Sequence, residues 1–346
     1  MSLVTRLPSR RWTKAGHWLR LLTALVFLPV AALADFREFK TIPVDAELGA
    51  KLNRAAGASL KDFPRLTADN LALSAIDLTK PETPVRADYH GDASFYPASL
   101  VKLFFMVETY RDFAAPGGEE VKSSKALHRY NGDEATMPQK KLTPEIERAL
   151  REMIYVSDND AAAFLLDILT DTCSGSELEG KALKDFIDRR RKLNRSFASL
   201  GYDISAMMKP WSFGPFGRDM QALGENKVNR NRASANSFTS LLLWIVRRHA
   251  ISPAASDAMM SLLERPLFPP RPTENQVKEF FGDSLPPGAR LWSKEGDTSE
   301  VRHDAAYIEL PSGRKLVIVI LTRGAADDKT LLPAIGKRLL AELDHS

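Results

Sequence analysis

Ser99 and Lys102 stand three residues apart at the start of an apolar run that predicts a helix. Residues at this spacing share one face of a helix, so the lysine amine can reach the serine hydroxyl. A desolvated lysine beside a second cation loses its proton near neutral pH and can activate a serine as a nucleophile. The pair alone also fits a helix cap beside a solvated lysine, and Ser312 and Lys315 repeat the spacing on a predicted hairpin.

A second short motif, Ser157-Asp158-Asn159, lies between two helical segments. A serine hydroxyl at such a place can relay a proton, and an asparagine amide can donate to a substrate carbonyl or orient a lysine. The same tripeptide is typical of a helix cap, which is the alternative interpretation.

A third motif, Lys294-Glu295-Gly296, ends a predicted strand. The lysine could supply the second cation, and the glycine would let a substrate backbone approach closely. By itself the tripeptide fits the exposed end of a surface strand equally well.

Taken together and in this order, the three motifs resemble those of the penicillin-recognising serine enzymes, the class A β-lactamases and their D,D-peptidase relatives. The resemblance covers most of the chain after the N-terminal segment. It extends through the helix that follows the second motif, residues 157–166, and through residues 301–304, which are similar to the strand whose arginine neutralises the substrate carboxylate. The resemblance implies a β-lactamase/transpeptidase-like fold and an acyl-enzyme mechanism.

The resemblance also implies a catalytic role for three residues. Ser99 would attack the carbonyl carbon, Lys102 would assist its deprotonation, and Ser157 would pass a proton to the leaving nitrogen. A fourth group, a loop glutamate that activates the deacylating water in class A β-lactamases, would be Glu225, which has the family's spacing to Asn229. The residues around Glu225 differ from the family's pattern, because Leu223 replaces an arginine and Asn226 replaces a proline.

The remaining implied roles concern substrate binding. Asn159 would hold the substrate amide and Lys102, while Lys294 and Arg302 would attract an anionic substrate. Gly296 would border the substrate, and the backbone N–H groups of Ser99 and Asp297 would form the oxyanion hole.

Glu295 departs from the family, which usually has threonine or serine beside the substrate carboxylate. Two like charges about 4 Å apart repel by roughly 4 kcal/mol at an effective dielectric constant near 20. Three explanations are open: Arg302 and Lys294 offset the charge, Glu295 turns away, or the preferred substrate is not a typical penicillin.

The charge of the chain is concentrated at its N-terminus. Residues 1–34 hold five basic and no acidic residues. Within this segment the basic residues precede a short apolar run that ends in a small-residue cleavage pattern, and this order predicts a secretory signal peptide. Its removal leaves 43 basic and 44 acidic residues, a net charge of −1, so no nucleic-acid partner is expected. An uncleaved membrane anchor is the alternative, but the apolar run is shorter than a membrane span needs. We expect a periplasmic or secreted monomer with no stable membrane association.

The single cysteine, Cys173, excludes an intramolecular disulfide framework and a Cys-x-x-Cys metal site. The six histidines are scattered without metal-ligand spacing, so neither a metal nor another cofactor is expected. The small molecule that the resemblance implies as a partner is a β-lactam or a cell-wall peptide.

Hydrophobic periodicity predicts strands near both ends of the chain and helices between them. This order predicts an α+β fold with one antiparallel five-stranded sheet, flanking helices and an inserted all-helical lobe. The single domain, 35–346, would divide into an α/β lobe at 35–95 and 285–346 and a helical lobe at 96–284. A helix is expected over 181–200 and a long loop over 209–236.

Three functions remain from the sequence. The first is an exported serine hydrolase of the class A β-lactamase type. The second is a D,D-peptidase or other amidase acting on cell-wall peptides. The third, suggested by Glu295, is a periplasmic binding protein that keeps the fold without catalysis.

Overall fold

The computed structural model describes residues 35–113, 126–128, 134–136, 144–211, 214–267 and 276–344. The predicted signal peptide, 1–34, lies outside the described residues. Everything described below belongs to the unit that runs from Ala31 to Ser346. None of its described helices combines the length and the hydropathy of a membrane span.

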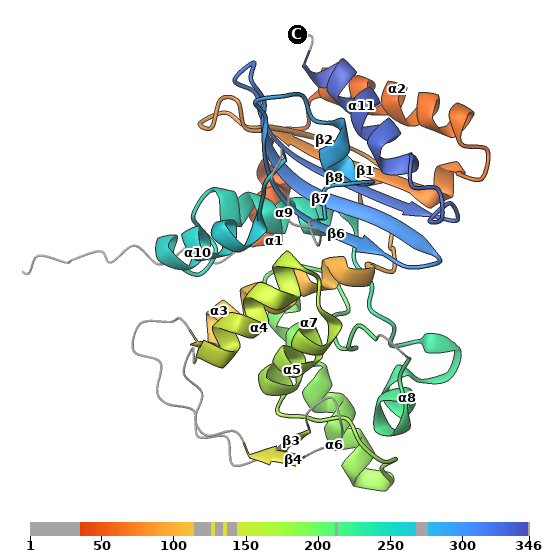
Figure 1. Ribbon diagram of the computed structural model, residues 1–346, viewed down its shortest axis with the longest axis vertical. Helices are drawn as coiled ribbons and strands as arrows, with labels where there is room; N and C mark the ends of the chain where they lie inside the picture. Colours follow the sequence, from red (N-terminus) through yellow and green to blue (C-terminus); the bar gives the residue numbers. More distant parts are fainter. Residues whose placement is uncertain are drawn as a thin grey trace, which may run out of the picture. The chain divides into compact units, whose positions relative to one another are not determined.

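An antiparallel sheet built from both ends of the chain organises the fold (Figure 1). Its strand order is β2-β1-β8-β7-β6-β5. The strands are β1 Leu71–Asp77, β2 Val85–Tyr89, β5 Glu264–Arg265, β6 Arg290–Asp297, β7 Val301–Glu309 and β8 Lys315–Arg323. The prediction of five strands is corrected to six, because β5 has only two residues, too few to show a period of two in the sequence. A separate pair joins β3 Ala126–His128 to β4 Glu134–Thr136.

Both faces of this sheet are buried, which explains the continuous apolar run of β8. Side chains of β8 alternate between two hydrophobic clusters, with Ile318 in one and Val319 in the other. The helices α2 Ala46–Asp62 and α11 Leu331–Leu343 cover the first face. The opposite face packs against α9 Ala235–Val246.

The other helices are α1 Phe36–Thr41, α3 Lys102–Phe113, α4 Pro144–Tyr155, α5 Asn159–Thr170, α6 Gly180–Arg190, α7 Lys192–Ser199, α8 Gly217–Leu223 and α10 Pro253–Leu263. Short 3₁₀ turns are η1 Ala68–Asn70, η2 Ala98–Val101, η3 Glu225–Lys227 and η4 Phe281–Ser284. The single helix expected over 181–200 is two helices, because the backbone departs from helical angles at Arg191. The loop expected over 209–236 contains α8 and η3, whose few residues give little periodicity.

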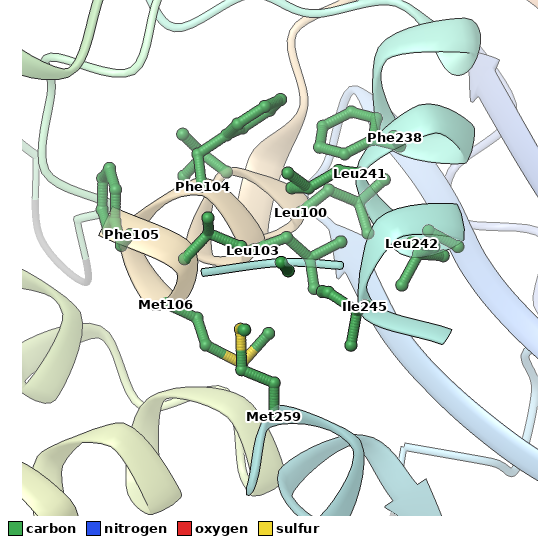
Figure 2. Close-up of a cluster of buried hydrophobic side chains, with 14 of the residues drawn as sticks. Leu100, Leu103, Phe104, Phe105, Met106, Phe238, Leu241, Leu242, Ile245 and Met259 are labelled. Atoms are coloured by element: carbon green, nitrogen blue, oxygen red, sulfur yellow. The ribbon is translucent and has the colours of Figure 1, made fainter. Parts of the chain in front are cut away.

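A hydrophobic cluster fixes the segment that carries the first motif (Figure 2). Leu100 and Leu103 are fully buried, and the Phe104 ring lies 5.3 Å from the Phe238 ring of α9. Met259 of α10 closes the cluster from below. Because the interior is close-packed, η2 and the first turn of α3 have little freedom to move.

Candidate active site

Ser99 lies in the 3₁₀ turn η2, immediately before α3. The turn is entered through Ala98, whose φ of 47° lies in the left-handed region that costs a non-glycine residue about 1 kcal/mol or more. The amide of Leu100 donates to the Pro97 carbonyl at 3.0 Å and closes the turn. A strained backbone held by a packed core presents the serine at a fixed position.

Lys102 is completely buried, and its Nζ lies 3.0 Å from Ser99 Oγ. Nζ is also 2.6 Å from the Ser157 carbonyl oxygen and 2.8 Å from Asn159 Oδ1. Burial, reinforced by the nearby ammonium of Lys294, lowers the pKa of Lys102 to about 7. A neutral amine that donates its two hydrogens to these carbonyl oxygens directs its lone pair toward the hydroxyl of Ser99.

In the second motif, Asp158 stabilises a helix end, and Ser157 and Asn159 contact Lys102. Asp158 caps α5, because its Oδ1 accepts from the Ala161 amide at 2.6 Å. Its neighbours point elsewhere: Asn159 Oδ1 reaches Lys102, and Ser157 Oγ lies 3.2 Å from the same amine. Ser157 has a φ of 64°, a second strained backbone position at the site. The cap interpretation therefore holds for the aspartate alone.

Lys294 is buried on β6, and its Nζ donates to Ser157 Oγ at 2.7 Å. Ser157 Oγ therefore lies between two amines, those of Lys102 and Lys294. Burial lowers the pKa of Lys294, while the charge of Glu295 opposes that shift. The two residues form an ion pair. Burial alone would raise the pKa of the Glu295 carboxyl, but Lys294 outweighs it, and the net pKa is lowered. Of the three explanations for Glu295, the structure therefore supports an offset by Lys294.

Gly296 packs against the segment that carries the serine. A Cβ placed on Gly296 would lie 2.8 Å from the Pro97 carbonyl oxygen and 3.1 Å from the Ser99 amide nitrogen. We expected this glycine to make room for a substrate backbone. In the structure the backbone of η2 occupies that space, so position 296 needs glycine for the close packing of β6 against η2.

Arg302 and Asp297 face each other across β7 and β6. The guanidinium is buried and lies 3.5 Å from Asp297 Oδ2. It also donates to the Glu279 carbonyl at 3.2 Å and stacks over the Phe280 ring at 4.3 Å. Asp297 is half-exposed at the end of β6, and burial, followed by the charge of Glu295, raises the pKa of its carboxyl.

The sequence matches the model of the β-lactamase enzyme family over residues 57–343. The chain belongs to this family. No curated protein matches its sequence. Across the described residues of this β-lactamase family member, no cluster of three or more histidine, cysteine or acidic side chains could hold a metal ion.

Solved structures similar to this family member share its fold at low sequence identity. A mutant of PBP-A, in an acyl-enzyme complex with penicillin G, is 17% identical with a TM-score of 0.59 over 86% of this chain and 97% of PBP-A. A β-lactamase from Sphaerobacter thermophilus is 20% identical with a TM-score of 0.54, over 83% of this chain and 96% of the other. A class A β-lactamase from Bacteroides cellulosilyticus is 17% identical with a TM-score of 0.55, over 86% and 99%.

Glu225, the predicted base for deacylation, is exposed in η3, and none of the hydrogen bonds of Lys102 within the described residues involves it. Its role stays a prediction. Asn229, the asparagine four residues after Glu225, donates to the Ala222 carbonyl at 2.8 Å and so stabilises the loop.

Sequence reasoning missed three residues beside the site, two through their side chains and one through its backbone carbonyl. Gln276 accepts from Lys294 at 3.2 Å, and the Glu279 carbonyl accepts from Arg302. His303 bridges the Tyr96 carbonyl, 2.9 Å from Nε2, to a backbone amide of β8 that donates to Nδ1 at 3.1 Å. His303 could have been found from the sequence, because it lies in the strand that resembles the family. Gln276 and Glu279 follow no recognisable pattern in the sequence.

Proposed function

We propose that this chain is an exported serine hydrolase that opens the amide bond of a β-lactam through an acyl-Ser99 intermediate. The observation that carries the proposal is the position of Lys102 Nζ, 3.0 Å from Ser99 Oγ, together with a pKa of about 7. A lysine that is partly neutral at physiological pH can take the proton of the serine as the new bond forms.

Acylation moves one proton from Ser99 to the leaving nitrogen of the substrate. Ser99 Oγ bonds to the carbonyl carbon while its proton moves to Lys102 Nζ. When the C–N bond breaks, Ser157 Oγ, in contact with both amines, gives its proton to the leaving nitrogen and takes the proton held by Lys102. Backbone N–H groups of Ser99 and Asp297 are the proposed donors to the oxyanion, supported by the close contact between β6 and η2 at Gly296.

A second function, a D,D-peptidase or penicillin-trapping amidase, is favoured by the position of Glu225. Rapid release of the acyl group requires a base that activates water, and Glu225 is exposed and forms no hydrogen bond with Lys102 within the described residues. With no such base the acyl-enzyme would persist. The solved acyl complex of the PBP-A mutant supports the chemistry of adduct formation on this fold.

A time course of intact mass after mixing residues 35–346 with excess benzylpenicillin tests both functions. A transient adduct with released product supports the β-lactamase, and an adduct that lasts for hours supports the amidase. The Ser99→Ala variant should show no adduct. If the wild-type chain also shows none at any penicillin concentration, both proposals are wrong and the non-catalytic binding protein remains.

We propose export because, within residues 1–34, basic residues are followed by an apolar run and then by a small-residue cleavage pattern. Expression of the full chain in a Gram-negative host, followed by N-terminal sequencing of the periplasmic fraction, tests it. A mature terminus at Asp35 is expected, and an uncleaved chain retained with membranes would contradict the proposal.

A further inference from the structure

The ammonium of Lys294 has no hydrogen left for a substrate anion. Its Nζ contacts Ser157 Oγ, Gln276 Oε1 at 3.2 Å, the Glu295 carbonyl oxygen at 2.9 Å and the Glu295 carboxylate. A protonated lysine has three N–H donors, and here four acceptors surround it. Its charge is paired as well, because Glu295 lies against it with a side chain that is only 7% exposed.

The guanidinium of Arg302 is already paired with acceptors of this chain. Nε and Nη2 both donate to the Glu279 carbonyl, and the carboxylates of Asp297 and Glu279 lie within 3.5 and 3.7 Å. The side chain is 4% exposed, and one face of the guanidinium stacks on Phe280. Both cations that the family resemblance assigns to an anionic substrate are therefore already paired with carboxylates of this chain.

Carboxylate oxygens that can accept a further hydrogen bond border this end of β6. Within the described residues, Glu295 Oε1 accepts no hydrogen bond, whereas Oε2 contacts Lys294 and Ser157. Asp297 lies two residues further along the same strand, with its carboxylate 48% exposed. Residues at this spacing project from the same face of a strand, so both carboxylates border the same side of β6.

We propose that Glu295 and Asp297 select substrates that carry an N–H donor, a carboxamide or an ammonium group, where a penicillin carries its carboxylate. This inference rests on the proposed acyl-Ser99 chemistry. A carboxylate placed beside these side chains meets two further carboxylates and finds no donor on Lys294, whereas an N–H group can donate to Glu295 Oε1 or to Asp297. Glu295 is thus a specificity-determining residue.

Acylation rates with matched substrates test the inference. Benzylpenicillin is compared with its 3-carboxamide and its 3-aminomethyl analogue, which differ only at the group in question and separate a neutral donor from a cationic one. The rate constant for adduct formation on residues 35–346 is measured by intact mass. We expect at least one donor analogue to acylate roughly tenfold faster than the carboxylate, a difference equal to one hydrogen bond.

Two variants should change this preference, one by reversing it and one by reducing it. Glu295→Thr frees the charge of Lys294, so the carboxylate should become the faster substrate. Asp297→Asn keeps the backbone N–H and removes one negative charge, so the ratio should fall partway. Glu264→Gln, at the exposed edge strand β5, is the matched control and should keep the wild-type ratio.

A neutral fluorophosphonate that labels Ser99 reports on the nucleophile independently of substrate choice. If the probe labels wild type and variants, and the carboxylate reacts as fast as the donor analogues in wild type, the specificity inference is wrong while the acyl-serine chemistry stands. An unchanged ratio in a labelled Glu295→Thr variant also overturns it. If the probe does not label wild-type Ser99, or if it does and no member of the set reacts, the proposed function fails and the inference with it.

Discussion

Gly296 lies directly against the amide nitrogen of Ser99, so that a Cβ at position 296 would come within 3.1 Å of that nitrogen. The contact joins strand β6, which carries Lys294, to the turn that carries the nucleophile. The glycine thereby sets the distance between two motifs that are far apart in the sequence.

Replacement of this glycine should impair acylation more than stability. In Gly296→Ala, the methyl group must displace the backbone of η2, and a shift of about 1 Å at a nucleophile can reduce the rate roughly 100-fold. The control is Gly57→Ala in α2, where a Cβ meets nothing within 4 Å; it should keep full activity and gain about 0.5–1 kcal/mol. Fluorophosphonate labelling and urea denaturation measure the two effects. Equal labelling rates in both variants would contradict the role assigned to the contact.

The protonation of Lys102 predicts the pH dependence of acylation. The neutral amine is the base, and with a pKa of about 7 its fraction falls as the pH drops below 7. The acylation rate should therefore rise about tenfold per pH unit up to about 7 and level off above it. Lys102→Arg, whose guanidinium stays protonated, should lose about 10²- to 10⁴-fold in rate.

Lys315→Arg is the matched control for this prediction, because it alters the lysine of the second Ser-x-x-Lys sequence, on the exposed start of β8. Its pH profile should match that of wild type. A wild-type profile that stays flat between pH 5 and 9 would show that another group activates Ser99.

The sequence predicts the fold better where the elements are long. The strands near both ends of the chain and the helices between them are expected from hydrophobic periodicity, and β1, β7, β8, α3 and α9 are among those that the structure shows. The two-residue strand β5 and the short helix α8 are missed, because pairing with distant strands or packing in a loop leaves no periodic signal in so few residues.

Within the site, the family resemblance of the three motifs predicts that Ser99, Lys102, Ser157 and Lys294 meet, and their side chains do. The role of Glu225 stays a prediction, because the separation of two loop residues along the chain does not determine where the loop itself packs. The partners of Lys294 could not be predicted from the sequence, since Gln276 meets the lysine only through the tertiary fold.

A buried ionic cluster predicts strong dependence on Asp167. Its carboxylate accepts from Arg190 at 2.8 Å and from Lys209 at 2.5 Å, and Arg190 also reaches Asp219 of α8 at 3.1 Å. Asp167→Asn leaves two buried cations with too little negative charge, which should cost about 3–5 kcal/mol of unfolding free energy.

The exposed pair of Lys181 and Asp185 provides the control for the buried cluster. Asp185→Asn should change the unfolding free energy by less than about 0.5 kcal/mol, because a solvated ion pair on a helix contributes little. Urea denaturation of both variants measures the difference. Similar losses in the two variants would mean that the buried cluster is not a structural requirement.

Two buried groups on β7 should oppose each other in the dependence of stability on pH. Burial lowers the pKa of His303 to about 4, so between about 6.5 and about 4 the unfolded chain binds a proton that the folded chain excludes, and acid destabilises. Burial raises the pKa of Asp304 to about 7, so between about 7 and 3.8 the folded chain keeps a proton that the unfolded chain loses, and acid stabilises.

Asp304→Asn removes the opposing titration, so the pH dependence of the unfolding free energy that His303 causes should become visible. Between pH 7 and pH 4 the variant should lose roughly 3 kcal/mol more unfolding free energy than wild type. Asp69→Asn, at an exposed position in η1, should follow the wild-type curve. Urea denaturation across this pH range gives the comparison, and superimposable curves for wild type and Asp304→Asn would refute the opposed titrations.

Tandem mass spectrometry of the penicillin-treated chain locates the acyl group on a residue and so tests whether Ser99 is the nucleophile. We expect the added mass of the intact penicillin on the proteolytic peptide that contains Ser99, at Ser99 itself, and no modified peptide in the Ser99→Ala variant. An acyl group on Ser157 or on any other residue, or a wild-type digest with no modified peptide, would contradict it.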